Sequence, residues 1–231
     1  AKLFPKARIA RMDSDTMRRK NAHRDVLAKF RVGKIDILIG TQMIAKGLDF
    51  PNVTLVGVVN PDHALHMADF RAGERVFQLL TQVAGRAGRG EVEGEVLVQT
   101  YTPHHPAIQA ARRMDFEGFC DQELAFRKEL HYPPYAHLTC ITLRGKHEAT
   151  VEKTGATLFH YLEQCVPDDV MLSPLVPAPI SRARGEYRYQ ILIRAEKTGV
   201  VTRAVRRSVA AIKKWPKGVK CTIDVDATSL L

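Results

Sequence analysis

Three short apolar runs limit what the first half of this chain can fold into, with one predicted helix before the first run and another, at residues 71–84, between the second and the third. The runs lie at residues 35–39, 53–59 and 95–99. Strands that are apolar at successive positions are buried on both faces, which is typical of a parallel sheet covered by helices. Strands that alternate with helices also favour parallel pairing through right-handed crossovers. Residues 1–106 are therefore predicted to form an α/β unit with a parallel sheet.

The second half changes its pattern after a pair of prolines. Residues 107–134 are predicted to form a helical connector ending at Pro133-Pro134, because proline cannot continue a helix and restricts the residue before it. Residues 135–231 are predicted to form an α+β domain with the order βαββαβ, a split βαβ arrangement. The stretch 174–179 carries three prolines and is predicted to be loop-rich. The elements located in this domain are strands at 138–143, 189–193 and 221–225 and helices at 148–165 and 202–215.

The string Gln-Val-Ala-Gly-Arg-Ala-Gly-Arg at residues 82–89 carries the clearest chemistry. Arg86 and Arg89 are three residues apart, so they share one face if the segment is helical. Arginine stays charged and its planar fork binds phosphate oxygens through two hydrogen bonds. A nucleotide hydrolase that works between two lobes needs such charge on the departing γ-phosphate. Arg86 and Arg89 are therefore candidate catalytic residues, and Gln82 is a third.

The site on which those arginines would act is absent from the sequence. No Gly-x-x-x-x-Gly-Lys-Ser/Thr loop is present, and the nearest string, Gly145-Lys146-His147, lacks the spacing and the hydroxyl. No Asp-Glu-x-His run is present to hold magnesium. The chain, which begins at Ala1, is therefore predicted to be the C-terminal part of a larger enzyme and to hydrolyse no ATP alone.

Composition narrows the class of protein. The chain has 231 residues, 45% of them hydrophobic, and no apolar run of about 20 residues that could span a membrane. Its four cysteines are scattered without a Cys-x-x-Cys pair, which indicates buried free thiols and argues against zinc within this segment. We expect a cytoplasmic protein with no membrane partner and no metal of its own.

Positive charge is concentrated near the C-terminus. The net charge is +10, and the segment 182–220 holds twelve lysines and arginines against two glutamates. Such a segment is typical of a polyanion-binding surface, although a solvated surface that aids solubility is the alternative. Tyr187 and Tyr189 lie among these cations, where a tyrosine stacks on an unpaired base or packs in the core. The candidate DNA-binding residues here are Arg182, Arg184, Arg188, Arg206, Arg207, Lys213 and Lys214.

Longer strings at residues 40–55, 69–75 and 78–89 resemble the primosomal protein N′ (PriA) family of bacterial replication-restart helicases, and the first, Gly-Thr-Gln-Met-Ile-Ala-Lys-Gly at 40–47, is the most particular. The resemblance implies a RecA-like second helicase lobe, without its first strand, and a C-terminal domain that binds DNA. It also implies a 3′-to-5′ DNA helicase that acts at stalled forks and helps to load the replicative helicase.

The resemblance further implies roles for individual residues. Arg86, Arg89 and Gln82 would face the triphosphate, whose ATP and magnesium site lies mainly on a first lobe outside this chain. Zinc would be held by a cysteine-rich module that precedes Ala1. The implied partners are forked and single-stranded DNA, primosome proteins and single-strand DNA-binding protein. Gly47, Asp49 and Gly85 are the expected nucleotide-side residues, and Thr41 and Gln42 are the expected DNA-side residues of the lobe.

Two other interpretations stay open from the sequence. The full protein could keep the scaffold and lack the motor, acting as a DNA-binding and partner-loading module. A related two-lobed translocase of recombination or repair is the second alternative. A Gly-Lys-Thr loop upstream of Ala1 would favour the motor.

Overall fold

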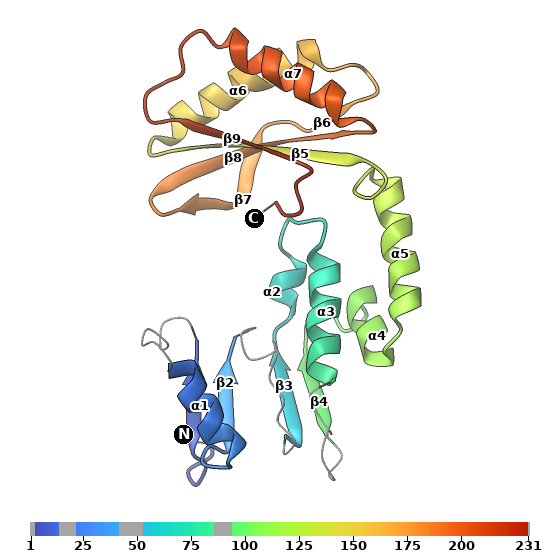
Figure 1. The fold of residues 1–231 in the computed structure, drawn as a ribbon, viewed down its shortest axis with the longest axis vertical. Helices are drawn as coiled ribbons and strands as arrows, with labels where there is room; N and C mark the ends of the chain where they lie inside the picture. Colours follow the sequence, from blue (N-terminus) through green and yellow to red (C-terminus); the bar gives the residue numbers. More distant parts are fainter. Residues whose placement is uncertain (1–2, 14–21, 42–52, 86–93, 231) are drawn as a thin grey trace. The chain divides into compact units, whose positions relative to one another are not determined.

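The computed structural model divides the chain into two compact units (Figure 1). The first contains residues 1–65 and 73–116, and the second contains residues 66–72 and 117–231. The chain therefore enters the second unit twice, first as a short segment between two helices of the first unit. The structure describes residues 3–13, 22–41, 53–85 and 94–230.

Within its described residues, the first unit contains two pairs of parallel strands. Strand β1 pairs with β2 across α1, and β3 pairs with β4 across α2 and α3. Parallel pairing agrees with the prediction from the apolar runs, and in the structure it forms two two-stranded sheets. The elements are β1 (Ile9–Met12), α1 (Ala22–Arg31), β2 (Ile37–Gly40), β3 (Leu55–Val59), α2 (Asp62–Leu65), α3 (Ala72–Ala84), β4 (Glu95–Gln99) and α4 (Pro106–Arg113).

Strand β1 lies where the sequence predicted no strand. A clamp between Arg8 and Asp36 fixes the start of both strands of this pair. The Arg8 amide and guanidinium donate to the Asp36 carboxylate over 2.6 to 2.8 Å, and the Met12 side chain at the other end is 1% exposed. The hydrogen bonds from Arg8 lower the pKa of Asp36 to about 2.

Helix α3 owes its position to one apolar stripe. Val76, Phe77, Leu80 and Val83 are each less than 9% exposed, and their spacing of three or four residues places them on one side of the helix. Phe77 also meets Phe116, with 6.2 Å between ring centroids. The opposite side of α3, with Gln78 and Gln82, is exposed.

The predicted helical run at 107–132 is interrupted in the structure. Helix α4 ends at Arg113, where Met114 takes the left-handed conformation with φ of 56°, and α5 (Phe116–Glu129) starts two residues later. The helical connector predicted at 107–134 therefore contains two helices, α4 and α5, within the described residues.

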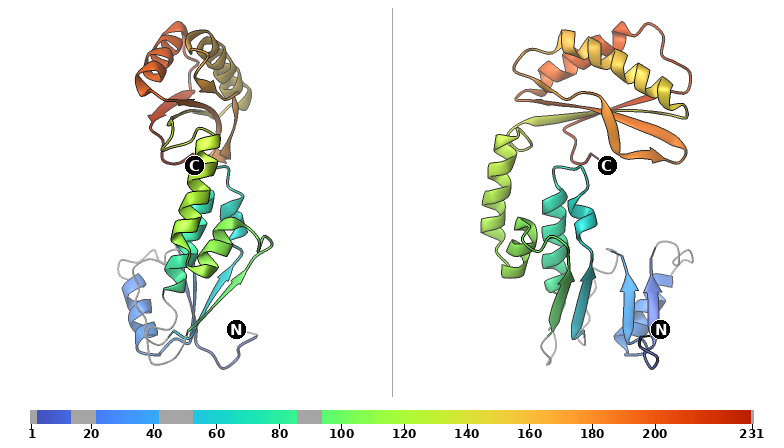
Figure 2. Two further views of the ribbon diagram at one scale, coloured as in Figure 1. Left: turned by 90° about the vertical axis from the view of Figure 1, so that its right-hand side faces the viewer. Right: turned by 180° about the vertical axis from the view of Figure 1, so that it is seen from behind.

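The second unit contains a five-stranded antiparallel sheet. Strand β5 lies between β8 and β9, and β6 and β7 pair with the other edge of β8. Both helices of the domain lie side by side on one face of this sheet (Figure 2). The elements are β5 (His137–Gly145), α6 (Glu148–Cys165), β6 (Met171–Leu172), β7 (Val176–Ala183), β8 (Glu186–Ala195), α7 (Thr198–Ala211) and β9 (Lys220–Val225).

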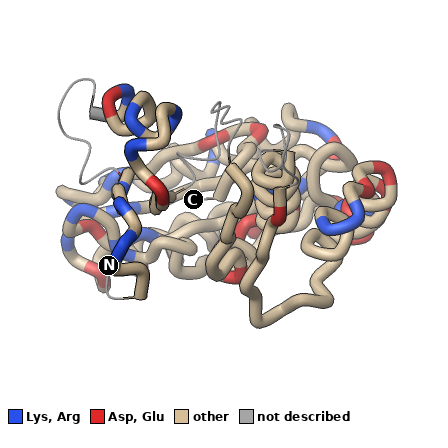
Figure 3. The backbone as a smooth tube through the Cα atoms, turned by 90° about the horizontal axis from the view of Figure 1, so that it is seen from below, with Lys and Arg blue, Asp and Glu red and all other residues tan. Residues whose placement is uncertain are grey.

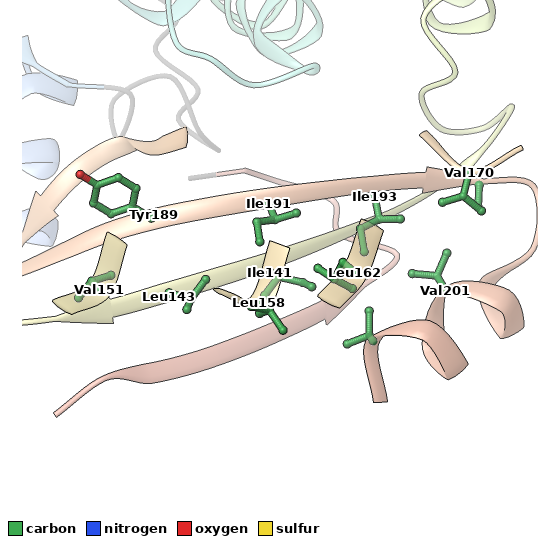
Figure 4. Packing of buried hydrophobic residues seen from close by; sticks show 12 residues of the cluster. Ile141, Leu143, Val151, Leu158, Leu162, Val170, Tyr189, Ile191, Ile193 and Val201 are labelled. Carbon is green, nitrogen blue, oxygen red and sulfur yellow. The ribbon is translucent and has the colours of Figure 1, made fainter. Parts of the chain in front are cut away.

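The main core lies between the sheet and its two helices. Alternate residues of β5 and β8, such as Ile141 and Ile191, point toward Leu158 and Leu162 of α6 (Figure 4), and all four are fully buried. Each such side chain contributes about 1.5–3 kcal/mol by burial. The order of the main elements confirms the predicted βαββαβ arrangement, with the short β6 added.

A smaller core covers the other face of the sheet. Leu138, Cys140, Ala227 and Leu230 are buried there, and Phe70 and Tyr132 pack against them. Burial raises the pKa of the Cys140 thiol, so this cysteine is an uncharged core residue. The segment 66–72 and the end of the chain therefore complete the domain on this side.

Two boundaries in this domain differ from the sequence prediction. Residues 174–179 were predicted to be loop-rich, yet β7 begins at Val176 and pairs with β8. Its prolines are accommodated because β7 is an edge strand with a register shift between Pro177 and Arg182. The predicted helix at 202–215 instead spans Thr198–Ala211, so Lys213 and Lys214 follow the helix.

Candidate nucleotide and nucleic-acid interfaces

Two of the nucleotide-side candidates, Gln82 and Gly85, lie at the end of α3. Gln82 is exposed in the last turn of that helix, and Gly85 forms the turn after it with its amide donating to the Thr81 carbonyl over 3.1 Å. Arg86 and Arg89 follow but lie outside the described residues. The structure therefore places the start of the arginine motif on a well-packed helix.

Gly85 has free space on the side where a side chain would be. A Cβ atom there would lie 3.6 Å from the Thr81 carbonyl oxygen and 3.8 Å from that of Gln82, both ordinary contacts. Among the described residues, no crowding at Gly85 requires a glycine. Glycine would be required at this position if another group came close to its backbone.

The other lobe candidates follow β2. Thr41 is exposed in a bend directly after Gly40, at the carboxyl end of that strand. Ligands of parallel sheets bind at this end of the strands. Gln42, Gly47 and Asp49 lie outside the described residues, so the structure does not place them relative to Thr41.

In the C-terminal domain, α7 presents a basic outer side. Val201, Ala204, Val205 and Ser208 are buried against the sheet, so Arg206 and Arg207 are left on the exposed side. Lys213 and Lys214 are exposed just beyond the helix. These four cations, which we call the α7 cluster, form no ion pair within the described part of the chain. Their charge is thus available to an anionic partner.

The β7–β8 hairpin carries a second group of arginines. Its turn is made by Arg184 and Gly185, whose φ angles of 50° and 78° are typical of a tight type I′ hairpin turn. Arg182 is exposed and places its guanidinium 4.9 Å from the centre of the Tyr187 ring. The side chain of Arg184 is exposed at the tip.

A row of cations crosses three neighbouring strands near this hairpin. Arg144 of β5 pairs in register with Arg188 of β8 and with Lys220 of β9. Like charges directly opposite each other destabilise a sheet unless an anion lies between them. Glu186 partly neutralises the row, since its carboxylate lies 3.8 Å from both Arg144 and Lys220. Arg144 was missed by the sequence analysis because it stands alone on its strand, and only the pairing register brings it beside Arg188.

The seven candidate DNA-binding residues of the C-terminal domain do not share one face of its sheet. Figure 3 marks lysines and arginines along the backbone in blue. Helix α7 packs on the face that holds Ile191 and Ile193. Strand alternation places Arg188 on the opposite face, with Gln190 and Leu192. The basic segment is therefore not one surface. Arg188 lies on the face opposite α7, whereas Arg182, which is paired in register with Tyr187, lies on the same face as Tyr189 and Ile191. We call Arg182, Arg184 and Arg188, which all belong to the β7–β8 hairpin, the hairpin group.

Of the two tyrosines among these cations, Tyr189 is a core residue. It is 8% exposed, and its hydroxyl donates to the Glu148 carboxylate over 3.3 Å. Burial, with the nearby Glu152 and Glu148 charges, raises the pKa of Tyr189. Tyr187 is half-buried beneath Arg182 and is the remaining candidate for stacking on a base.

The Gly145-Lys146-His147 string has a packing role at its first position. A Cβ atom on Gly145 would lie 2.7 Å from the backbone carbonyl oxygen of Gly218 and 3.0 Å from a methyl group of Val151. Glycine is required there by the approach of two backbone segments. Packing therefore explains this glycine without a phosphate-binding role.

Within the described ranges, no three or more His, Cys, Asp or Glu side chains are grouped so that they could hold a metal ion. Asp226 instead bonds His137, with 2.6 Å between carboxylate oxygen and Nδ1. None of the helices in the described part of the chain combines the length and apolar character needed to cross a membrane.

Comparison with known proteins identifies both units. A family profile described as "Helicase conserved C-terminal domain" matches residues 1–91, and one described as "Primosomal protein N C-terminal domain" matches residues 128–228. The protein named "Replication restart protein PriA" from Bacillus subtilis (strain 168) is 45% identical over 226 residues, which is 97% of this chain and 28% of that protein. The chain belongs to the PriA family of replication restart proteins.

Other PriA proteins match over the same extent. The protein of that name from Synechocystis sp. is 46% identical over 98% of this chain and 27% of its own length. The one from Chlamydia pneumoniae is 40% identical over 97% of this chain and 30% of its own length. The chain thus spans less than a third of these PriA relatives. Its helicase-profile region includes α3 and the arginine motif, and its primosomal-profile region includes β5 to β9.

Proposed function

We propose that the full protein is an ATP-dependent 3′-to-5′ DNA helicase that restarts replication at stalled forks in the bacterial cytoplasm. Residues 1–106 would form part of its second lobe, 107–134 a helical connector, and 135–231 a DNA-binding domain. The observation that carries the proposal is the similarity to PriA over 97% of the chain, including the arginine motif that follows α3.

The lobe is suited to act on a nucleotide held by another part of the protein. Bound ATP and magnesium would supply a phosphoryl group whose developing charge needs stabilisation. Gln82 is exposed at the end of α3, and the backbone of Gly85 is open on one side among the described residues, so both fit an approaching triphosphate. Arg86 and Arg89 would hold phosphate oxygens, and Gly47 and Asp49 would contact the nucleotide. Thr41 and Gln42 would contact the tracked strand.

The C-terminal domain would bind the DNA backbone chiefly through the α7 cluster. Its four cations are exposed and form no ion pair within the described residues, so contacts with DNA phosphates would break no existing ion pair. The hairpin group would add further contacts, and Arg188 would do so on the other face of the sheet with Arg144 beside it. Forked and single-stranded DNA are the proposed partners, together with primosome proteins and single-strand DNA-binding protein. Zinc would be held by a cysteine-rich module elsewhere in the protein.

The test is the substitution Arg86→Ala in the full-length protein. Loss of an arginine that stabilises the transferred phosphoryl group lowers turnover by roughly 10³-fold or more. DNA-stimulated ATP hydrolysis and unwinding of a forked duplex should both fall by this order, while DNA binding is retained. Arg112→Ala, on the exposed side of α4, is the matched control. Unchanged hydrolysis in the Arg86 variant would remove this arginine from the mechanism.

The same experiment separates the motor from its alternatives. A full-length parent protein that binds forked DNA but never hydrolyses ATP would be a DNA-binding and partner-loading scaffold. A parent protein that hydrolyses ATP but prefers recombination intermediates to stalled forks would be a related translocase.

A further inference from the structure

The open face of the five-stranded sheet lies opposite α6 and α7 (Figure 2). Its two ends differ in what covers them. Leu138 and Cys140, near the start of β5, are buried in the smaller core. Further along β5 on the same face, Thr142 is half-buried and Arg144 is exposed. One end of the open face is thus packed, and the other is in contact with solvent.

The solvent end carries Arg144, Arg188 and Lys220 in register on three neighbouring strands, and we call these three the cation row. Neighbouring strands are about 4.8 Å apart, so the backbone positions of the three cations lie within about 10 Å. The side chains of Arg144 and Lys220 are 46% and 63% exposed. On the same face, Thr222 of β9 is exposed beside Thr142. Cations and hydroxyls are the groups through which proteins contact DNA phosphates.

Glu186 offsets part of the positive charge of the cation row. Its carboxylate oxygens lie 3.8 Å from Arg144 and 3.8 Å from Lys220, longer than the about 2.7–2.9 Å of a close ion pair. Asp224 is on the same face of β9, four residues and therefore about 13 Å from Lys220. Three positive charges and one adjacent negative charge leave the row with a net charge of +2, so it still attracts a polyanion.

Helix α7 carries the α7 cluster on the opposite side of the domain. Val201 and Val205 pack this helix onto the face of the sheet that holds Ile191. The exposed side of the helix, with Arg206 and Arg207, therefore points away from the sheet. A helix with its side chains is about 10–12 Å wide, and this width together with the sheet separates the α7 cluster from the cation row.

One straight duplex does not reach both surfaces, because they face opposite directions. DNA has a persistence length of about 150 bp, so a short duplex does not bend around a domain of this size. Both surfaces consist of cations on the exterior of the domain, which bind phosphates whatever the base sequence. Two segments of DNA can therefore occupy the domain at the same time, one on each surface.

The cation row suits the phosphates of a duplex better than the bases of a single strand. Single strands are bound by stacking on aromatic rings as well as by charge. Strand alternation places Tyr187 and Tyr189 on the side of β8 that faces the helices, so neither ring is offered on the open face. What the row presents to a ligand is positive charge beside the Thr222 hydroxyl.

We propose that the C-terminal domain binds branched DNA through both faces, with one duplex arm on the α7 cluster and a second arm on the cation row. The inference rests on the proposed DNA-binding function and names the form of DNA that the domain prefers. When two arms are joined at a branch point, the second contact becomes intramolecular, so the branched molecule binds more tightly than either arm alone. The domain thus distinguishes a fork from a linear duplex by geometry.

The test is the double variant Arg144→Gln with Arg188→Gln in the full-length protein. Fluorescence anisotropy gives the affinity for a fork with double-stranded arms and for a linear duplex of the same length. At 200 mM salt we expect the affinity for the fork to fall about 20-fold, since two phosphate contacts with a salt slope of about 0.9 each are lost. The affinity for the linear duplex should stay within about 2-fold, because a duplex on the α7 cluster does not need the cation row.

Two further variants complete the comparison. Arg206→Gln with Arg207→Gln should lower the affinity for both DNAs, because the surface with the larger charge is lost to each. Arg112→Gln with Arg113→Gln, on the exposed side of α4, is the matched control and should bind both DNAs as the parent does.

The variants of the cation row should keep the fold, because they remove like charges that lie opposite each other in the sheet. Thermal melting checks this. If the double variant is unfolded, Lys220→Gln on the edge strand β9 takes its place. It removes one phosphate contact and should lower the affinity for the fork alone, by about 4-fold at 200 mM salt.

Three results would overturn binding through both faces. The first is an unchanged affinity for the fork in a folded variant of the cation row. The second is an equal loss of affinity for the fork and the linear duplex, since this indicates one continuous DNA-binding surface. The third is a parent protein that binds the linear duplex as tightly as the fork. A parent protein that binds neither DNA would overturn the proposed DNA-binding function itself.

Discussion

Replacing Arg206 and Arg207 together with glutamine removes two cations from the exposed side of α7 and leaves its buried side intact. Glutamine has nearly the same helix propensity as arginine, so the fold should be retained. If each arginine neutralises one duplex phosphate, the slope of log K against log salt becomes shallower by about 0.9 per residue, or ~1.8 in total. The affinity of the double variant should then be lower by ~200-fold at 50 mM salt but by only ~20-fold at 200 mM.

The assay is fluorescence anisotropy with a labelled duplex over a salt series. The matched control is the double variant of Arg112 and Arg113, two adjacent exposed arginines of α4 that carry the same charge. It should follow the parent slope. A loss of affinity that is the same at both salt concentrations would refute the phosphate contacts. An unchanged affinity would assign DNA to the hairpin group instead.

Three other perturbations follow from the structure. Gly145→Ala should destabilise the C-terminal domain by about 1–3 kcal/mol in denaturant unfolding, because its Cβ would lie 2.7 Å from the Gly218 carbonyl oxygen; an effect below about 0.5 kcal/mol would contradict the packing. Asp62 accepts hydrogen bonds from Thr102 and neighbouring groups, and these bonds lower the pKa of its carboxyl group. The stabilisation is complete above the pKa of an aspartate in the unfolded chain, about 4, and is lost as the pH falls below that value. Asp62→Asn should therefore flatten the fall of Tm below about pH 4, and pH profiles parallel to those of the parent would argue against this. Gly85→Ala should leave Tm unchanged, because the described surroundings leave room for the methyl group. It should reduce DNA-stimulated ATP hydrolysis of the full-length protein by about 10-fold, because a nucleotide close to this backbone would leave no such room. Full activity would show that no nucleotide comes close to Gly85.

The elements that could be predicted from the sequence are those set by local periodicity. The parallel pairing of β3 with β4 and the extent of α6 follow from apolar runs and stripes that persist over enough residues. Strand β1 is only four residues long and its tie to β2 is the ion pair of Arg8 with Asp36, 28 positions away. That tie has no local signature, so the strand was missed.

The candidate site shows the same division between local and distant information. The motif at 82–89 and the charge excess at 182–220 are visible in the sequence because their members are close together along the chain. The row formed by Arg144, Arg188 and Lys220 depends on the register of three strands, which single residues do not encode. Likewise, alternation along β8 separates Arg188 from the α7 cluster, although both lie in one basic segment.

The packing of residues 66–72 affects how the C-terminal domain can be isolated. A fragment cut at the junction of α4 and α5 would keep every strand of the five-stranded sheet yet lose Phe70 and Asp69. Leu138 and Cys140 would be opened to water on that side, and residues 228–230 would lose three hydrogen bonds, two to Asp69 and one to Arg71. Such a fragment should be less soluble than its strand content suggests, and a short peptide spanning residues 66–72, added separately, is the reagent that should restore it.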